Sequence, residues 1–332
     1  MTVASDQRRV NLESEKHVHA APRSHSGAVA ISSTRVSPTR AQSGAAVVMA
    51  LLVVAFATMI VSGTFYRQSI IARTVENQTA AAQTYWLMAG AVDWMRVILR
   101  EDGRASATDH LAEPWAVPLE QTRLNDDDRD PAWLSGGVKD GQAGINLRNL
   151  VGSDGPVAAE VEVLGRLLSV AGLDEGLAEP IAQVIDSALS TRSEDIRVFP
   201  ANIDEIAFTD PELREALVQI RAFVTILPIA TPVNANTAPA EVLAARFENV
   251  SLIDARRLVA SRDRAAFKDL NDVLTRLSDL KPSVPSGQLT VATSFFILDG
   301  AIEFRRARLH QRALLHRKSG TVEVVWKREV QA

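Results

Sequence analysis

Between Arg40 and Arg67 the chain carries no charged residue, and the run from Ala45 to Val61 within this interval is almost entirely apolar. A helix that spans a membrane needs about 20 mainly apolar residues, because the hydrocarbon core is about 30 Å thick and each residue rises about 1.5 Å. The sequence therefore predicts a membrane-spanning segment over residues 45–64, with Gly44 directly in front of it. No second run of this kind occurs in the 332 residues.

Charge is distributed unevenly around this segment. Residues 1–44 hold six basic and three acidic residues, whereas the whole chain has a net charge of −4, so the remainder carries −7. The acidic remainder argues against nonspecific binding of nucleic acid, which depends on Lys and Arg near phosphates. The basic flank predicts a cytoplasmic N-terminus, and Arg67 and Arg73 on the far side weaken this prediction without reversing it. Because the chain has no cysteine, disulfides, thiolate catalysis and cysteine-bound zinc are excluded.

The apolar pattern continues beyond the predicted span. Apolar residues recur at helical spacing from Ile70 to Leu99, and Gly103 is expected to end the helix. A continuous helix over 45–100 would be about 84 Å long, with its first half in lipid and one face of its second half packed on a soluble domain. Two interpretations remain open at this point: an uncleaved signal anchor, or a helix whose leader is removed before the apolar run.

The soluble part divides by its periodicity into a helical block between two groups of strands. An irregular stretch over 104–135 and a short strand pair over 136–147, turning at Asp140-Gly141, come first. We expect the strands on both sides of the block to form one antiparallel sheet packed on the second half of the long helix. The predicted helices cover 164–171, 177–189, 210–220, 237–243, 251–261 and 267–277, and the later strands cover 291–298, 301–305, 310–316 and 321–326.

Several short motifs follow one another along the chain: Ser43-Gly44 before the apolar run, Ala89-Gly90-Ala91-Val92-Asp93-Trp94, Glu113-Pro114-Trp115, Gly144-Ile145-Asn146-Leu147-Arg148-Asn149-Leu150, Val233-Asn234-Ala235-Asn236-Thr237-Ala238-Pro239, Phe267-Lys268-Asp269-Leu270 and Val325-Trp326. Each motif is weak alone, but their joint order and spacing are specific. From about Gly44 to Trp326 the chain resembles the minor pseudopilin K family (GspK-type) of bacterial type II secretion systems.

The resemblance implies an α+β fold, in which a pilin-like long N-terminal helix packs on an antiparallel sheet and a large all-helical domain is inserted. We accordingly expect a basic leader over 1–44 and the transmembrane part of the long helix over 45–64. The pilin-like helix and first strands would cover 65–155, the inserted helical domain 156–285, and the C-terminal strands of the sheet 286–332. Residues 233–277 of the inserted domain also resemble a helix-hairpin-helix module.

The resemblance further implies a structural function in protein export and no enzymatic activity. A family member is cut by a prepilin peptidase after the glycine that matches Gly44, and the new N-terminus, here Ala45, is methylated. It lies in the inner membrane as a single-pass protein, with a cytoplasmic N-terminus and a periplasmic main domain, at the tip of a short fibre. The expected partners are the other minor pseudopilins, the major pseudopilin and the peptidase, with no nucleic acid.

Met49 occupies the fifth position after the expected cleavage site. Most pilin-like helices carry a glutamate there, which pairs with the N-terminal ammonium of a neighbouring subunit. A charge buried in lipid without its partner is costly. A subunit at the tip has no earlier neighbour, so the absence of the carboxylate fits a tip position, although Met49 also fits an ordinary membrane-filling residue.

Two features depart from the family pattern. The leader is longer than the short basic leader usual in the family, which leaves open a start downstream, for example at Val29 or Val36. Family members also tend to carry an acidic, glycine-containing loop associated with calcium. The matching stretch offers Asp186, Glu194 and Asp195 and has no glycine. Because calcium takes about 6–8 oxygen ligands, a solvated acidic loop is favoured here over a calcium site.

The main alternative function is that of a membrane-anchored helix-hairpin-helix protein for DNA binding or uptake. Such a hairpin presents backbone N–H groups to phosphate through glycines. Here the hairpin over 247–251 has no glycine and carries Glu248. Four arginines supply positive charge, which a solvated helix face would explain equally well: Arg256, Arg257, Arg262 and Arg264. We therefore interpret this stretch as a shared fold without the DNA site.

A membrane-anchored enzyme is a further alternative, but the sequence shows no catalytic constellation. No zinc-protease, serine-hydrolase or phosphate-loop motif occurs, and His110, His310 and His316 have no partners at ligand spacing. Asp126-Asp127-Asp128 is interpreted as a solvated turn. The asparagines of two motifs are interpreted as sheet and turn hydrogen-bonding residues rather than ligands: Asn146, Asn149, Asn234 and Asn236.

Overall fold

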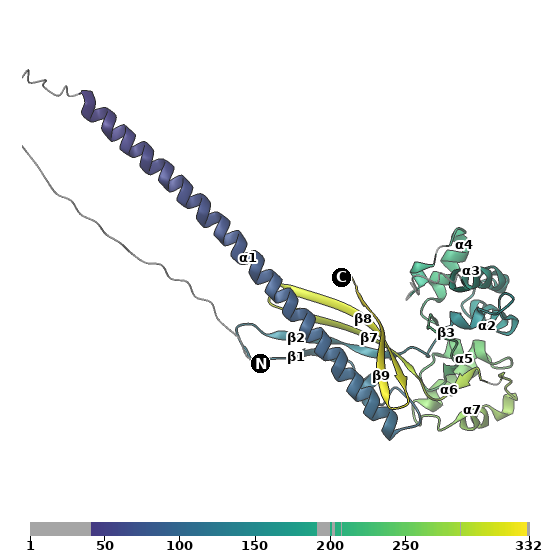
Figure 1. Ribbon diagram of the computed structural model, residues 1–332. Coiled ribbons are helices and arrows are strands. Elements are labelled where there is room, and N and C mark those ends of the chain that lie inside the picture. The colour runs from purple at the N-terminus through teal and green to yellow at the C-terminus, as the bar shows by residue number, and fades with distance from the viewer. Residues whose placement is uncertain (1–40, 191–199, 201–202, 207, 286, 331–332) are drawn as a thin grey trace, which may run out of the picture. The chain divides into compact units, whose positions relative to one another are not determined.

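The computed structural model (Figure 1) describes residues 41–190, 200, 203–206, 208–285 and 287–330. The chain divides at Arg67 into two compact units, Met1–Arg67 and Gln68–Ala332. In the first unit the described residues are helical and belong to α1 (Ala41–Ala105), whose remaining residues lie in the second unit. The leader predicted over 1–44 lies almost entirely outside the described residues.

The long helix predicted over 45–100 is confirmed, but α1 begins earlier and ends later than expected. The prediction that Gly103 ends the helix is wrong, because the backbone N–H of Ser106 still donates to the carbonyl of Asp102 at 2.9 Å. Glycine costs about 1 kcal/mol inside a helix but does not forbid it. A Cβ at Gly103 would lie only 3.0 Å from Cδ of Arg317, so the glycine leaves room for this side chain.

A five-stranded antiparallel sheet forms the body of the second unit, in the order β1-β2-β7-β8-β9. The central pairing joins β2 to β7 across the helical block, with Val138 opposite Leu298. The prediction of one antiparallel sheet built from strands on both sides of the block is therefore confirmed. The strands are β1 (Leu119–Arg123), β2 (Ala132–Asp140), β7 (Phe295–Phe304), β8 (Ala307–Lys318) and β9 (Thr321–Glu329).

The second half of α1 packs on this sheet, as Figure 1 shows. Val92, Met95 and Leu99 of the helix lie in one apolar cluster with Phe296 of β7 and Leu315 of β8. These helix residues are spaced by three and four, the spacing that places side chains on one helix face. The predicted packing of one helix face on the sheet is therefore confirmed.

The strand pair predicted over 136–147 is wrong. β2 ends at Asp140, and Ile145–Asn146 forms β3, which pairs in parallel with β4 (Val224–Thr225). The local Asp-Gly signal is overridden by long-range contacts, since the N–H of Gly141 donates to the carbonyl of Phe295 at 2.8 Å. The stretch 104–135, expected to be irregular, also contains β1, a short and largely exposed edge strand.

The helical block contains each of the predicted helices, with some shifted ends. Asp210 and Ser251 cap α4 and α6 as expected, and Gly172 adopts φ +80° just beyond α2. The last helix begins at Leu270, three residues later than predicted. The helices are α2 (Ala158–Val170), α3 (Ala178–Ser190), α4 (Pro211–Ile220), α5 (Ala240–Arg246), α6 (Leu252–Arg262) and α7 (Leu270–Arg276).

Short 3-10 turns occur before and within the block. Those before it are η1 (Pro114–Ala116) and η2 (Leu147–Leu150), and those within it are η3 (Glu175–Leu177), η4 (Ile203–Glu205) and η5 (Ser278–Leu280).

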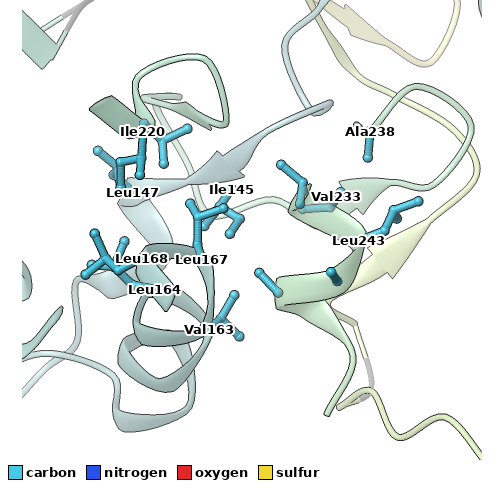
Figure 2. Close-up of a cluster of buried hydrophobic side chains, with 14 of the residues drawn as sticks. Ile145, Leu147, Val163, Leu164, Leu167, Leu168, Ile220, Val233, Ala238 and Leu243 are labelled. Atoms are coloured by element: carbon cyan, nitrogen blue, oxygen red, sulfur yellow. The ribbon is translucent and has the colours of Figure 1, made fainter. Parts of the chain in front are cut away.

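A single apolar core holds the helical block together. Ile145, Leu164, Leu167, Val233 and Leu243, all labelled in Figure 2, belong to one buried cluster. The predicted fold class is confirmed, and the inserted domain is mainly helical. It also contains the two-residue strands β4 and β5 (Val233–Asn234), of which β5 pairs in parallel with β6 (Leu289–Thr290) beyond residue 285. The boundaries 156 and 285 stay predictions, and the core takes in residues on both sides of them.

Candidate assembly helix and polar junction

The predicted processing residues lie in α1. Gly44, Ala45 and Met49 are all exposed, and no atom lies within 4 Å of the position that a Cβ at Gly44 would occupy. Among the described residues, one helix is long and apolar enough to cross a membrane, and it is this one. Every residue from 44 to 67 is exposed, which is the arrangement expected of a segment that a bilayer or neighbouring helices would cover. Nothing in the structure tests whether the chain is cut after Gly44.

The part of α1 in the second unit has two unlike faces. Met88, Val92 and Leu99 are buried against the sheet. On other faces of the same helix Trp86 and Trp94 are 71% and 51% exposed. Exposed aromatic side chains in a soluble part of a protein commonly mark an interaction surface. The helix therefore offers an apolar surface after the sheet has covered its inner face.

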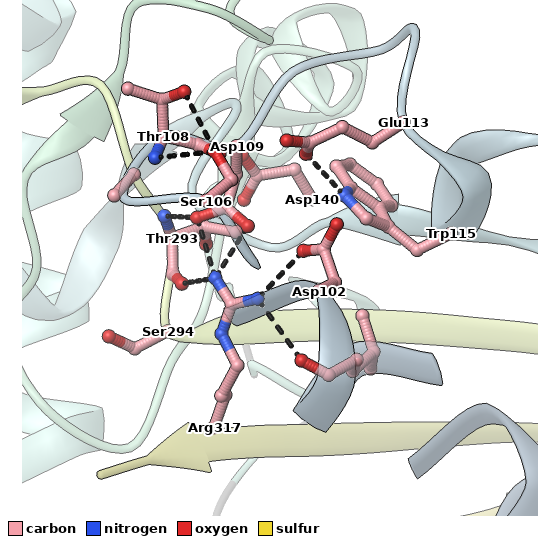
Figure 3. A network of polar contacts seen from close by, with 12 residues as sticks. Asp102, Ser106, Thr108, Asp109, Glu113, Trp115, Asp140, Thr293, Ser294 and Arg317 are labelled. Carbon is pink, nitrogen blue, oxygen red and sulfur yellow. Dashed lines mark hydrogen bonds and ion pairs between the residues drawn. The ribbon is translucent and has the colours of Figure 1, made fainter. Parts of the chain in front are cut away.

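A partly buried arginine joins the end of α1 to the rest of the second unit (Figure 3). Arg317 of β8 contacts Asp102 at 3.0 Å, and its Nη2 lies 2.5 and 2.6 Å from the two carboxylate oxygens of Asp109. The same guanidinium donates to the carbonyls of Leu99 and Thr293 at 3.3 and 3.0 Å. Four segments of the chain therefore meet at one side chain, which we call the polar junction.

Burial sets the electrostatics of the polar junction. Burial raises the pKa of Asp102 from 3.8 to about 6, and the neighbouring carboxylate of Glu113 adds to the rise. Burial also raises the pKa of Asp109, although the N–H of Thr293 and the guanidinium of Arg317 oppose this effect. For Asp102 and Asp109 the desolvation that raises the pKa therefore outweighs the attraction of Arg317, which lowers it. The neighbouring carboxylate of Glu113 adds to the rise of both pKa values.

Glu113 completes the acidic side of the polar junction. Its Oε2 accepts hydrogen bonds from the indole N–H of Trp115 at 2.8 Å and from the backbone N–H of His110 at 2.9 Å. Carboxylate oxygens of Asp102, Asp109 and Glu113 all lie within 4.8 Å of one another, which is close enough to hold a metal ion. Arg317 already supplies a cation to two of the three, so we interpret the cluster as an internal ion network.

A further buried carboxylate, that of Asp140, ends β2 beside the polar junction. Its Oδ2 accepts hydrogen bonds from the hydroxyl of Thr237 at 2.6 Å and the side-chain amide of Asn234 at 2.8 Å. Its Oδ1 accepts the backbone N–H of Gln142 at 2.6 Å. Burial raises the pKa of Asp140, and these hydrogen bonds oppose the rise. Thr237 was predicted to open α5, but its hydroxyl binds Asp140 instead, and Pro239 is the residue before the helix.

The interpretation of the motif asparagines is confirmed. Asn146 donates to the carbonyl of Ile229 at 2.8 Å and accepts the N–H of Leu227 at 3.1 Å. Asn236 accepts the N–H of Phe267 at 2.7 Å and donates to its carbonyl at 3.0 Å. Each amide satisfies backbone groups of a distant segment, as buried polar groups must. Asn149 and Asn234 do the same with Thr231 and with Asp109.

The calcium prediction is not tested. Asp186 lies in α3, while Glu194 and Asp195 lie outside the described residues.

The arginines of the alternative DNA-binding interpretation are mostly engaged within the protein. Arg262 is buried and donates to the carbonyls of Ala235 and Ala238 at 2.9 and 2.6 Å. Arg257 contacts Asp254 at 3.2 Å. Arg256 lies 3.6 Å from Glu241. Arg262 is therefore not available to a phosphate, whereas Arg256 and Arg257 are exposed and each lies beside one carboxylate.

The three histidines have no partners at ligand spacing in the sequence, and in the structure two of them each have one acidic neighbour. Nε2 of His310 lies 2.5 Å from Asp299, and His110 lies 3.7 Å from Glu113. His316 instead stacks on the ring of Phe295 at 4.1 Å. None of these arrangements brings a nucleophile and a base together.

These features define a class: an α+β protein in which a long, partly apolar N-terminal helix packs on an antiparallel sheet, with a mainly helical domain inserted between the strands. The family model of type II secretion system protein K matches residues 233–292. Over 282 residues the chain is 29% identical to type II secretion system protein K of Pseudomonas aeruginosa, which covers 77% of this chain and 83% of that relative.

The fold is also found in a solved structure. A chain in the crystal structure of the GspK-GspI-GspJ complex from the type 2 secretion system of enterotoxigenic Escherichia coli matches with a TM-score of 0.59 and 21% identity, covering 78% of this chain and 99% of that chain. The family resemblance predicted from the sequence is therefore confirmed, and the chain is similar to type II secretion system protein K. The matched segment 233–292 includes the predicted helix-hairpin-helix-like part.

Proposed function

We propose that this chain is a minor pseudopilin of a type II secretion system, with a structural function in protein export. The observation that carries the proposal is α1, whose first part is uncharged and exposed while its second part packs by one face on the sheet. The similarity to protein K supports this role. The GspK-GspI-GspJ complex supports other minor pseudopilins as partners. The major pseudopilin, below them in the fibre, is a further partner in this proposal.

The proposed topology is a single pass through the inner membrane. Residues 45–64 cross the bilayer, the basic segment before them stays in the cytoplasm, and the second unit lies in the periplasm. Prepilin peptidase removes the leader after Gly44, and Ala45 becomes the methylated N-terminus. N-terminal mass spectrometry of the protein purified from membranes tests this step, and an N-terminus at any other residue contradicts it.

A matched pair of glycine variants separates the effect of Gly44 on cleavage by the peptidase from its effect on helix stability. Gly44 and Gly63 both lie in α1, and at each the Cβ position has no atom within 4 Å. Replacing either by valine therefore changes helix propensity by the same small amount. We expect Gly44→Val to retain the leader and Gly63→Val to lose it. Equal processing of both variants would remove Gly44 from the proposal.

The tip position rests on Met49 and is tested by Met49→Glu, with Met49→Leu as control. An unpaired carboxylate at this depth costs about 2.5–3.5 kcal/mol on insertion scales. At the tip no earlier subunit offers an ammonium, so we expect Met49→Glu to reduce recovery of the chain with its partner pseudopilins from membranes. If the chain occupied the body of the fibre, the glutamate would be tolerated or would improve assembly.

A further inference from the structure

The segment between α1 and the turn η1, residues 106–113, is held in place by acidic side chains. Within this range, all of which the structure describes, only Asp109 and Glu113 are buried, whereas Leu111 and Ala112 are exposed. Apolar side chains therefore contribute little to the position of residues 106–113, which we call the connecting segment.

Asp109 joins the connecting segment to the helical domain and to the sheet. Its backbone N–H donates to the carbonyl of Val291 at 3.0 Å, and its own carbonyl accepts the side-chain amide of Asn234 at 3.0 Å. Its carboxylate accepts the N–H of Thr293 at 2.7 Å and binds Arg317 of β8. If these contacts were lost, the segment would be released from the helical domain and from the sheet together.

The charges at the polar junction do not balance. Oxygens of Asp102, Asp109 and Glu113 lie within 4.8 Å of one another, and each of these side chains is at most 8% exposed. Among the described residues, Arg317 is the one arginine or lysine that pairs with them. Three ionised carboxylates beside one guanidinium leave two negative charges unbalanced. Because like charges in a buried site disfavour ionisation, this geometry favours the uptake of a proton.

Asp102 is the carboxyl group that binds this proton most readily. Arg317 donates to both oxygens of Asp109, and Glu113 accepts hydrogen bonds from two N–H groups. Asp102 accepts from Arg317 alone among the described residues, at 3.0 Å. Its ionised form is therefore the least stabilised of the three. Burial, with a further contribution from Glu113, accordingly raises the pKa of Asp102 to about 6.

The described residues of the elements around Asp102 bring no second arginine or lysine into the polar junction. On α1 the neighbouring Glu101 is engaged by two arginines of its own helix. On β8 the residue after Arg317, Lys318, pairs with a carboxylate of β9 at 2.9 Å. The chain just before β7 contributes Thr293, which is uncharged.

Two other titratable groups border the polar junction. Nε2 of His110 lies 3.7 Å from Glu113, and the side chain of His110 is 29% exposed, so water screens any charge that it gains. Asp140, at the end of β2, is held by neutral donors that include Thr237 and Asn234. Asp102 is therefore the group through which pH acts most directly on the connecting segment.

Ionisation of Asp102 has a structural consequence, because a third buried negative charge then faces the two that the connecting segment carries. Outward movement of the segment admits water and separates the carboxylates, which relieves both the desolvation and the repulsion. We propose that the polar junction is a proton-controlled latch, which holds the connecting segment and the helical domain together when Asp102 is protonated and lets the segment open when Asp102 is ionised. The latch lies wholly within the second unit and does not depend on the proposed role in secretion.

Amide hydrogen exchange of the full chain in lipid nanodiscs tests the latch. The amides of Asp109 and His110 report on the connecting segment, because the first donates to Val291 and the second to Glu113. After correction for intrinsic rates, we expect their protection to be about tenfold lower at pH 7 than at pH 5. Opening returns the pKa of Asp102 from about 6 to 3.8, so ionisation favours the open form by about this factor. Equal protection at the two pH values overturns the proposal.

Three variants assign the effect to the charge of the polar junction. Asp102→Asn removes the titrating group, so the connecting segment should be equally protected at pH 5 and pH 7. Glu113→Gln removes a neighbouring carboxylate and should reduce the pH effect, which provides a second test if Asp102→Asn does not fold. The matched control is Asp93→Asn on the same helix, where a 67% exposed side chain pairs with Arg96, and it should keep the tenfold change. A full pH effect in both junction variants contradicts the latch.

A low concentration of urea separates local opening from global unfolding. At pH 7, addition of about 1 M urea should leave the exchange of the Asp109 amide unchanged, because opening a short segment exposes little new surface. The amide of Leu168, in the core of the helical domain, should exchange faster under the same conditions. If the two amides respond alike to urea, the connecting segment opens only when the protein unfolds, and the latch is overturned.

Discussion

The inserted helical domain and the helix–sheet part of the second unit are stabilised in different ways. The helical domain has one continuous apolar core from Ile145 to Leu289. Along α1 the apolar contacts with the sheet fall into three smaller clusters, around Ala80, Met88 and Val92. The end of the helix is held instead by the polar junction, in which one arginine binds two carboxylates and two carbonyls.

This difference has an energetic consequence. Apolar burial is divided among many contacts, and each buried methylene contributes about 0.8 kcal/mol. A buried ion network is stabilising only while it is complete, because removing one member leaves the others desolvated and unpaired. The helical domain should therefore weaken gradually with substitution, whereas the junction should fail at single positions. The helical domain itself contains an ion pair of the sensitive kind, the buried pair of Arg246 with Glu160 at 2.9 Å.

The largest expected effect is that of Arg317→Ala. The change leaves Asp109 and Asp102, whose side chains are 2% and 8% exposed, without their cation, which we expect to cost about 3–5 kcal/mol of unfolding free energy. The matched control is Arg308→Ala, an arginine of the same strand in an exposed pair with Glu303, with an expected cost under about 1 kcal/mol. Urea unfolding of both variants measures the difference. Similar losses would show that the junction is no more important than a surface pair.

The next effect, that of Leu168→Ala, examines the apolar side of the comparison. Leu168 is fully buried in the helical core, and its truncation should cost about 2–5 kcal/mol. All five tryptophans lie outside the helical domain, so their fluorescence reports on the helix–sheet part, while far-ultraviolet circular dichroism also reports on the helices.

Because residues 68–332 form one compact unit, we expect both signals to shift together in Leu168→Ala. Two separated transitions would mean that the helical domain unfolds by itself and that the comparison is between independent domains.

A smaller effect is the pH dependence of the junction. The folded pKa of Asp102 is about 6, above its usual 3.8, so the folded state binds more protons than the unfolded state between these values. Its contribution is therefore fully present below about pH 4 and is lost as pH rises through 6. Between pH 5 and pH 7 wild-type stability should fall by about 1 kcal/mol relative to Asp102→Asn. A pH profile identical in the two proteins contradicts this assignment.

The difference between local and long-range contacts also determines how much of the structure the sequence predicts. Helices of the inserted domain follow from local signals, namely apolar spacing and the caps Asp210 and Ser251, and each is present. The strands that were missed, β1, β4, β5 and β6, are short and carry no alternation of their own, whereas β3 lies within a predicted strand and only its pairing differs. The hairpin expected at Asp140-Gly141 does not close, because the N–H of Gln142 donates to the side chain of Asp140 and the N–H of Gly141 continues the ladder to the carbonyl of Phe295.

The polar junction could not be predicted from one sequence. Arg317 and Asp102 are 215 positions apart, and nothing local distinguishes them from surface charges. Glu113-Pro114-Trp115 was visible as a motif, and the indole bond to Glu113 explains its internal spacing, but the motif does not name its distant partners. By contrast, Gly44, Ala45 and Met49 are defined by their places relative to the apolar run, so sequence alone locates them and the fold adds only that they are exposed.

The smallest effect, that of Ser251→Ala, tests whether such local signals also stabilise the helical domain. The hydroxyl of Ser251 accepts the backbone N–H of Asp254 at 3.2 Å and contacts its carboxylate at 2.5 Å. Loss of this cap should cost about 1 kcal/mol. The control is Ser283→Ala, an exposed serine outside any helix, which should be neutral. A cost for Ser251→Ala as large as that for Arg317→Ala would mean that the helical domain also depends on single polar contacts, and the proposed contrast would fail.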